Sequence, residues 1–168
     1  KAVTFPKHPL FEVIPEALFY ETMIEKVVIP ENIKKIDNFA FGNCRNLVDV
    51  TFDSSSKLEV IGPNAFTGTM ISYISFPSKL RLIDEAAFAN SNLKEIIFSR
   101  YKPVLETIGE EAFSNNLIEE IYFPHSIKYI KKRAFFNCFM LKGIGFPKNC
   151  ILESIDEFAF ESCNLYGL

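Results

Sequence analysis

Cysteine, histidine and acidic side chains are the residues of this 168-residue chain that could act as nucleophiles, metal ligands or acid–base pairs. The four cysteines include no Cys-x-x-Cys pair, the spacing of common zinc sites. Three of them, Cys44, Cys138 and Cys163, each follow a recurring phenylalanine by three residues. We expect buried free thiols at one equivalent position, because an unligated cysteine behaves as a small apolar residue.

One pair of cysteines is still a candidate for a disulfide. If repeated units stack at about 4.8 Å per strand, Cys44 and Cys138 are four units and about 19 Å apart, which is too far for a bridge. Cys138 and Cys163 belong to adjacent units and could just reach each other. The sequence leaves open whether this pair is bridged.

The histidines and acidic pairs do not form a catalytic pattern. His8 and His125 are five units apart, or about 24 Å at the same spacing, whereas catalytic groups must lie within hydrogen-bond reach. No nucleophile elbow, phosphate-binding loop, zinc-protease or dinucleotide motif occurs. Glu110–Glu111 and Glu119–Glu120 could be calcium ligands or paired carboxylates, but their positions favour solvated surface charge. We predict no enzyme, no cofactor and no metal site.

Composition favours a folded chain that does not bind nucleic acid. The chain is 48% hydrophobic and 23% charged, with a formal net charge of -3, so its apolar content is too high for disorder. No uncharged apolar run approaches the roughly 18 to 20 residues of a membrane-spanning helix. No basic stripe is present to bind phosphates. The 18 phenylalanines and absent tryptophan indicate one structural position that recurs many times.

The recurring position is the phenylalanine of an Ala-Phe dipeptide. This dipeptide occurs six times, and Leu18-Phe19 stands in the same frame. Successive phenylalanines are alternately 22 and 25 residues apart, so two units make a 47-residue period. The phenylalanines are Phe19, Phe41, Phe66, Phe88, Phe113, Phe135 and Phe160. We predict a single domain, residues 1–168, of about seven stacked units.

Each unit contains two extended segments with a turn between them. After each phenylalanine comes an apolar-x-x-apolar-x-apolar segment, whose alternation predicts a short strand with one buried face. These segments are 24–29, 47–52, 71–76, 93–98, 118–123 and 141–146. Before each phenylalanine lies a shorter segment such as 33–36, followed by N-cap candidates at Asp37, Asp84 and Asp156. We therefore expect an α/β repeat solenoid with one short helical or 3₁₀ turn per unit.

The repeat resembles the BspA-like leucine-rich repeats, which are found mostly in bacterial and protist surface proteins. The junctions Asn43–Leu47 and Asn137–Leu141 match the Asn-Cys-x-x-Leu pattern of that family, and the match extends from about Phe5 to Leu168. The resemblance implies a right-handed superhelix with a short parallel β-sheet on its concave face. It also implies that partners bind on this concave sheet.

Side chains at two positions of each long strand point away from the core, because side chains alternate along a strand. The third position carries Lys26, Asp49, Tyr73, Glu95, Glu120 and Gly143, and the fifth carries Val28, Thr51, Ser75, Ile97, Tyr122 and Gly145. Tyr73, Ile97 and Tyr122 resemble the anchors of a protein interface, although ordinary strand propensity would explain them equally well. The candidate ligand-binding surface consists of the first five residues named for each of the two positions.

A second candidate surface lies in the loops that leave the long strands. The extra residues of every second unit fall in these loops, so one edge of the solenoid should carry a protruding loop at every second unit. Arg100, Tyr101 and Lys102 occupy one such loop, and loops often hold binding residues. The alternative is a spacer that merely tolerates insertion.

The predicted function is non-catalytic recognition of a protein or glycan, in the manner of a cell-surface adhesin. The alternatives are a structural spacer and a docking or regulatory module attached to an enzyme. A cell-surface or secreted location is implied by the family resemblance only. The chain begins and ends inside a unit, so we expect a piece of a longer array whose uncapped ends can associate end to end. No nucleic acid partner and no membrane insertion are expected.

Overall fold

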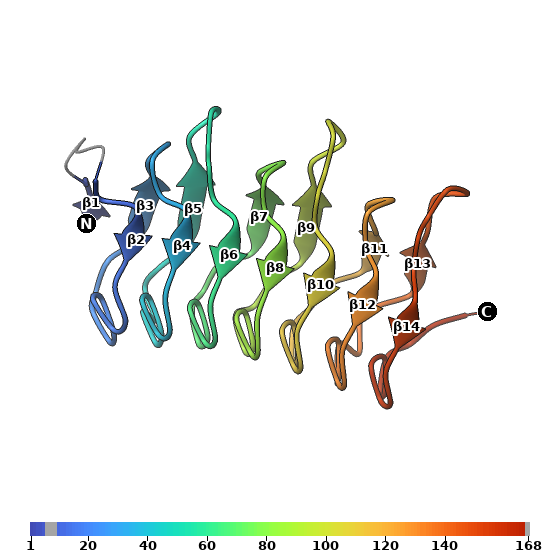
Figure 1. Ribbon diagram of the computed structural model, residues 1–168. Helices are drawn as coiled ribbons and strands as arrows, with labels where there is room; N and C mark the ends of the chain where they lie inside the picture. Colours follow the sequence, from blue (N-terminus) through green and yellow to red (C-terminus); the bar gives the residue numbers. More distant parts are fainter. Residues whose placement is uncertain (6–9, 167–168) are drawn as a thin grey trace.

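The computed structural model describes residues 1–5 and 10–166, which form a parallel β-solenoid of about seven turns (Figure 1). One set of strands follows the predicted long segments. It comprises β1 (Ala2–Val3), β3 (Lys26–Ile29), β5 (Asp49–Phe52), β7 (Tyr73–Phe76), β9 (Glu95–Phe98), β11 (Glu120–Tyr122) and β13 (Gly143–Gly145). The other set comprises β2 (Val13–Ile14), β4 (Lys35–Ile36), β6 (Val60–Ile61), β8 (Leu82–Ile83), β10 (Thr107–Ile108), β12 (Tyr129–Ile130) and β14 (Ser154–Ile155).

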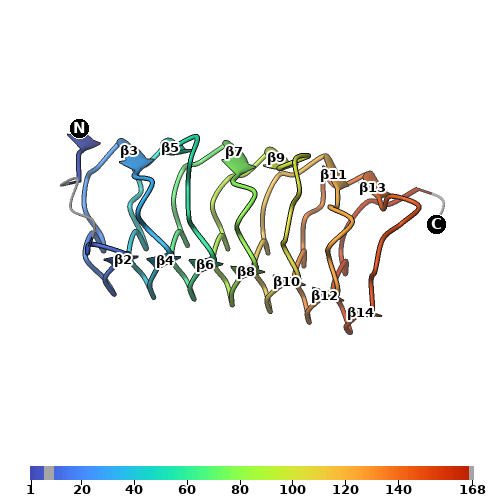
Figure 2. The same cartoon turned by 45° about the horizontal axis from the view of Figure 1, so that its top comes forward.

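The two sets of strands lie on opposite sides of a flattened coil (Figure 2). The two-residue strands pair into one continuous seven-stranded parallel sheet. The longer strands form three separate parallel sheets, β1-β3-β5, β7-β9 and β11-β13. We call the outer side of these three sheets the long-strand face. Its division into separate sheets was not predicted from the sequence.

The predicted phenylalanine spine is present. Phe41, Phe66, Phe88, Phe113 and Phe135 are fully buried, and neighbouring rings stack nearly parallel with centroids 5.1 to 5.5 Å apart. Offset stacking of this kind adds stabilisation to that of apolar burial. The core is therefore a column of equivalent side chains, and each unit completes the packing of its neighbours.

The turns around the spine contain no helix within residues 10–166, so the predicted α/β class and helical turns are wrong. In each unit the residues two before and two after the spine phenylalanine have positive φ, as at Phe39 (φ 51) and Asn43 (φ 55). This alternation interrupts helical geometry. Each turn instead donates its N–H groups to the next unit, as Phe41 does to the Ala65 carbonyl at 2.8 Å.

The predicted N-cap aspartates lie in these turns without capping a helix. Oδ1 of Asp37 accepts the Asn38 N–H, and Oδ1 of Asp84 accepts the Glu85 N–H, both at 2.8 Å. The N–H of Asn38 lowers the pKa of Asp37, with a smaller contribution from Lys35. Glu111, predicted to start a helix, has φ 53. No run of helical residues follows these carboxylates, so each of the two aspartates stabilises a single turn and not the start of a helix.

The position three residues after each spine phenylalanine carries a side-chain hydrogen-bond donor. Its residues are Thr22, Cys44, Thr69, Ser91, Asn116, Cys138 and Cys163. Each donates to the carbonyl of its own spine phenylalanine or of the preceding one; Ser91 Oγ, for example, lies 2.6 Å from the Phe66 oxygen. The cysteines therefore occupy a column of donors that satisfies buried carbonyl groups.

The loops leaving the long strands alternate in length, as predicted. The loops after β5, β9 and β13 each rise higher than the loop of the unit before, after β3, β7 and β11 respectively (Figure 1). The long strands lose their pairing between β5 and β7 and again between β9 and β11. Both breaks follow a unit with a long loop. Strand pairing is therefore interrupted with the same two-unit period as the sequence repeat. The domain limits and the handedness of the superhelix stay predictions.

Candidate functional site

The long-strand face presents the two predicted columns of outward side chains. Parallel registration places Lys26 beside Asp49, Tyr73 beside Glu95, and Glu120 beside Gly143. The alternate residues of the same strands, such as Ile74 and Ile121, are fully buried. The prediction of which residues face outward is therefore confirmed, whereas their binding role stays a prediction.

In the first half of this face, the charged side chains pair with each other and the remaining side chains are small. Nζ of Lys26 forms an ion pair with Asp49 at 3.3 Å. In the fifth column Val28 is 58% exposed, and it is followed by the small polar residues Thr51 and Ser75. One exposed valine beside a paired charge and two hydroxyls offers few features to a ligand.

The second half of the face combines apolar and unpaired charged groups. Tyr73 and Ile97 are 48% and 37% exposed, and Tyr122 is 70% exposed. Glu95 and Glu120 are also exposed, and neither forms an ion pair with another described residue. Three large side chains close to uncompensated charge make this half the stronger candidate for binding.

Two contacts fix the orientation of Tyr122. Its hydroxyl donates to Oε2 of Glu120 at 3.1 Å, and this hydrogen bond to the carboxylate raises the pKa of Tyr122. Its ring occupies space beside Gly145, where an added Cβ would lie 2.5 Å from Cδ1 of the ring. The ring is thus held across β13 while most of its surface faces solvent.

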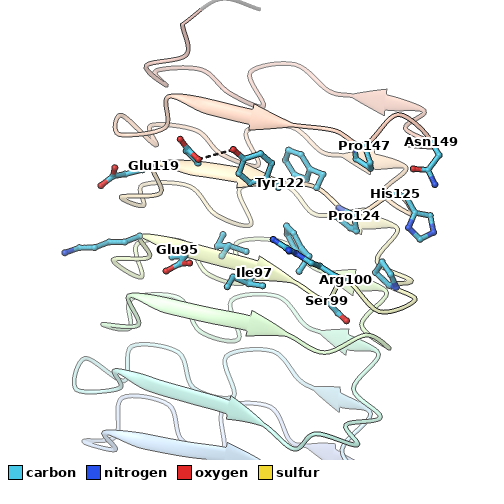
Figure 3. A pocket seen from close by; sticks show the side chains of 16 residues that line it. Glu95, Ile97, Ser99, Arg100, Glu119, Tyr122, Pro124, His125, Pro147 and Asn149 are labelled. Atoms are coloured by element: carbon cyan, nitrogen blue, oxygen red, sulfur yellow. Dashed lines mark hydrogen bonds between the residues drawn. The ribbon is translucent and has the colours of Figure 1, made fainter.

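An open groove of about 830 Å³ lies where β9 and β11 separate. Figure 3 shows Glu95 and Glu119 at one end, His125 and Asn149 at the other, and Ile97, Tyr122 and Arg100 between them. Ile96, Phe98 and Phe123 also line it although they are buried. The groove therefore reaches down between the two strands to the level of the core.

The loop end of this groove was missed in the sequence. Pro124, His125, Pro147 and Asn149 contribute to it, and none of them stands in the two strand columns. Proline two residues after the end of β11 and of β13 was a visible signal that strand pairing stops there. His8, the other histidine considered, lies outside the described residues.

The predicted loop surface and the predicted strand surface meet at Arg100. Arg100 lines the groove, whereas Tyr101 is 73% exposed with Nζ of Lys102 placed 5.6 Å from its ring centre. Tyr101 also borders a smaller hollow of about 300 Å³ at the equivalent break between β5 and β7. The loop after β9 therefore separates two hollows that lie one double unit apart.

The thiols have the properties of structural residues. All four cysteines are free, and Cys44 and Cys138 are fully buried. Burial raises the pKa of Cys138 to about 12 and that of Cys163 to about 11. The nucleophilic thiolate is thus disfavoured. Among the residues that the structure describes, no three cysteine, histidine or acidic side chains gather as metal ligands.

The chain belongs to the BspA-type leucine-rich repeat region family. The family model matches six copies over residues 12–115 and 106–168. This match confirms the resemblance drawn from the Asn-Cys-x-x-Leu junctions, and it indicates no enzyme family. No curated protein matches the sequence. In the two described parts of the chain there is no helix with the length and apolar character needed to cross a bilayer.

Solved structures of bacterial proteins share this fold. The pneumococcal vaccine antigen PcpA is 30% identical with a TM-score of 0.70, over 74% of this chain and 31% of the antigen. A leucine-rich cell surface protein of Faecalibacterium prausnitzii is 21% identical with a TM-score of 0.58, over 86% and 47% of the two chains. The leucine-rich repeat protein TpLRR of T. pallidum is 20% identical with a TM-score of 0.66, over 92% and 72%. The chain thus matches less than half the length of the first two.

Proposed function

We propose that this chain is a non-catalytic recognition module that binds a protein ligand at a cell surface through its long-strand face. The observation that carries the proposal is the exposure of Tyr73, Ile97 and Tyr122 in adjacent units of one face. Large aromatic and branched side chains near the centre of an interface supply most of its binding energy. A rigid sheet also holds these groups in place, which lowers the entropic cost of binding.

The relatives support a surface location for this module. One structural neighbour is described as a cell surface protein and another as a vaccine antigen. An array of repeats suits such a location, because it presents an extended face of neighbouring strands. Adhesion is accordingly the proposed role, with a protein on another cell as the ligand.

A cell-binding assay tests this proposal. Fluorescently labelled chain is added to panels of epithelial and bacterial cells, and bound fluorescence is measured by flow cytometry. The combined variant Tyr73→Ala, Ile97→Ala and Tyr122→Ala should bind at least about tenfold more weakly, the loss expected for anchors worth 1.4 kcal/mol or more. A matched control replaces Val13, Leu18 and Phe139, which are exposed outside this face, and should bind normally.

Two outcomes would count against the proposal. Equal binding by the wild type and the long-strand variant would remove this face from recognition. Absence of wild-type binding to every cell type would favour the structural spacer instead.

A further inference from the structure

The groove between β9 and β11 is a site where the sheet opens. We call the side where the chain enters the two strands the entry side, and the side where it leaves them the loop side. At the entry side one backbone hydrogen bond joins the residues before the strands, from the Leu117 N–H to the Leu93 carbonyl at 2.8 Å. No ladder pairing follows between the described strands. The rings of Phe98 and Phe123 are 6.3 Å apart, whereas those of Phe123 and Phe146, within the next sheet, are 4.8 Å apart. The strands therefore diverge from the entry side toward the loop side.

Acidic side chains predominate at the entry side of this groove. Glu95 and Glu119 stand there (Figure 3), and their sequence neighbours Lys94 and Glu120 also line the groove. Arg100 and His125 come from the loops that follow β9 and β11. None of these six side chains forms an ion pair with any residue for which the structure gives a position. Elsewhere on the same face, Lys26 and Asp49 neutralise each other. The groove thus keeps uncompensated charge of both signs.

Two large side chains, Ile97 and Tyr122, stand in the middle of the groove beside Arg100 (Figure 3). Ile97 projects from β9, and Tyr122 projects from β11 with its ring fixed by Gly145 and Glu120. An aromatic ring held in one orientation offers contact area with little loss of side-chain entropy on binding. An apolar side chain of a ligand would fit between these two residues.

From these features we propose that the groove binds an extended peptide segment of a protein partner, with a basic and an acidic side chain on either side of an apolar one. The basic side chain faces Glu95 and Glu120, the apolar side chain packs on Ile97 and Tyr122, and the acidic side chain faces Arg100 and His125. Carboxylates pair with lysine or arginine, and a guanidinium binds a carboxylate in a fork geometry. This inference rests on the proposed function and specifies the ligand of the same face.

The lengths of groove and peptide agree. Glu95 and Phe98 are the two ends of β9, about 10 Å apart in extended chain, and Arg100 follows two residues later in the loop. In an extended peptide, residues i, i+2 and i+4 share one face and span about 13 Å. The charged side chains supply the remaining reach, so three alternate peptide residues cover the three regions of the groove.

Synthetic peptides test the inference by fluorescence anisotropy. Three labelled twelve-residue peptides share a threonine framework, and each carries three residues at alternate central positions. The first has Lys, Ile and Glu in that order, the second has the reverse order, and the third has Ser, Ile and Ser. One of the charged peptides should bind at least about tenfold more tightly than the Ser peptide, and added salt should weaken its binding.

A charge-reversed protein variant supplies the control for specificity. Glu95→Lys, Glu120→Lys and Arg100→Glu together should reverse which charged peptide binds more tightly. All three residues are exposed, and the contact with Gly145 still holds the Tyr122 ring when its hydrogen bond to Glu120 is lost. Arg100→Glu alone, a milder change, should weaken the preferred peptide about tenfold. Circular dichroism confirms that each variant is folded.

The inference is overturned if neither charged peptide binds better than the Ser peptide, or if the charge-reversed variant keeps the wild-type preference. Its failure is distinguishable from that of the proposed function. Peptides that show no charge preference, together with cell binding lost in the Tyr73, Ile97 and Tyr122 variant, would contradict the peptide site alone. Cell binding retained by that variant would contradict the proposed function, which is recognition through the long-strand face.

Discussion

The ring of Tyr122 occupies the space that a side chain at Gly145 would need. A Cβ at this glycine would lie 2.5 Å from Cδ1 and 2.9 Å from Cε1 of the ring. The glycine therefore determines the position of an aromatic side chain on the neighbouring strand. The relationship links two residues whose strands pair in register, Tyr122 opposite Gly145.

Replacing Gly145 with alanine should displace Tyr122 with little effect on stability. The methyl group pushes the ring away and breaks its hydrogen bond to Glu120. Because that hydrogen bond raises the pKa of Tyr122, the pKa of its phenol should fall toward the usual tyrosine value. Titration of ¹³C-labelled tyrosine by NMR measures this shift, and an unchanged pKa would show that the ring had not moved. Gly143→Ala is the matched control, since its Cβ would meet Glu120 at an ordinary 3.6 Å.

Truncating the phenylalanine spine should destabilise the solenoid. Phe88 is fully buried between Phe66 and Phe113, with ring centres at 5.1 and 5.5 Å. Phe88→Ala should lower the free energy of unfolding by about 3 to 5 kcal/mol, through lost burial and the cavity left behind. Urea denaturation measures the change, with Phe139→Ala, at a position 54% exposed, as the control near zero. A loss below about 1 kcal/mol for Phe88→Ala would contradict the spine as the main stabilising element.

The spine shows what the sequence alone could establish. A phenylalanine that recurs alternately after 22 and 25 residues predicted the seven units. The alternation of side chains along each strand predicted that Tyr73 and Ile97 face outward. The turns were predicted wrongly, because positive φ at residues as different as Phe39 and Asn43 follows from hydrogen bonding between units. Asn or Gly stands two residues after five of the seven spine phenylalanines, and because these residues adopt positive φ most readily, they were the visible signal of such a turn.

The groove was beyond prediction for a related reason. It exists because β9 and β11 diverge after a unit with a long loop. The 47-residue period was visible, but its effect on strand pairing was not. Arg100 and Tyr122 were therefore assigned to separate surfaces, although they line one groove.

Cys138 should behave as a hydrogen-bond donor that serine can replace. Its Sγ donates to the Phe113 carbonyl at 3.2 Å, as Ser91 donates at the equivalent position. Cys138→Ser should keep this interaction, whereas Cys138→Val should remove it and cost about 0.5 kcal/mol more, because Nδ2 of Asn116 still donates to the same carbonyl at 3.0 Å. Equal unfolding free energies for the two variants would show that the donor column contributes nothing.

Cys138 also predicts a pH dependence of stability. Burial raises the pKa of its thiol from 9.0 to about 12 in the folded state, so the unfolded chain loses the proton first as pH rises. Its contribution to stability is therefore fully present below pH 9 and declines between pH 9 and about 12. Urea denaturation at pH 8 and pH 10.5 should show a larger loss for wild type than for Cys138→Ser. Equal losses would show that this thiol does not ionise differently on unfolding.

The opening between β9 and β11 should be visible in amide exchange. Pairing with β7 protects one edge of β9, while the edge facing β11 has no ladder partner. NMR-detected hydrogen exchange should show faster exchange for the β9 amides that face β11 than for those that face β7. The continuous sheet supplies a control, because β12 is paired with both β10 and β14. Uniform protection along both edges of β9 would contradict the opening.

Site-specific photo-crosslinking tests recognition by the long-strand face most directly. A photoreactive phenylalanine at Ser75, which is exposed between Tyr73 and Ile97 in the two columns, is compared with one at exposed Glu59 beside β6 on the opposite sheet. On cells that bind the wild-type chain, irradiation should join a surface protein to the Ser75 position and not to the Glu59 position. Crosslinks from Glu59 alone, or equal crosslinks from both positions, would contradict binding through this face.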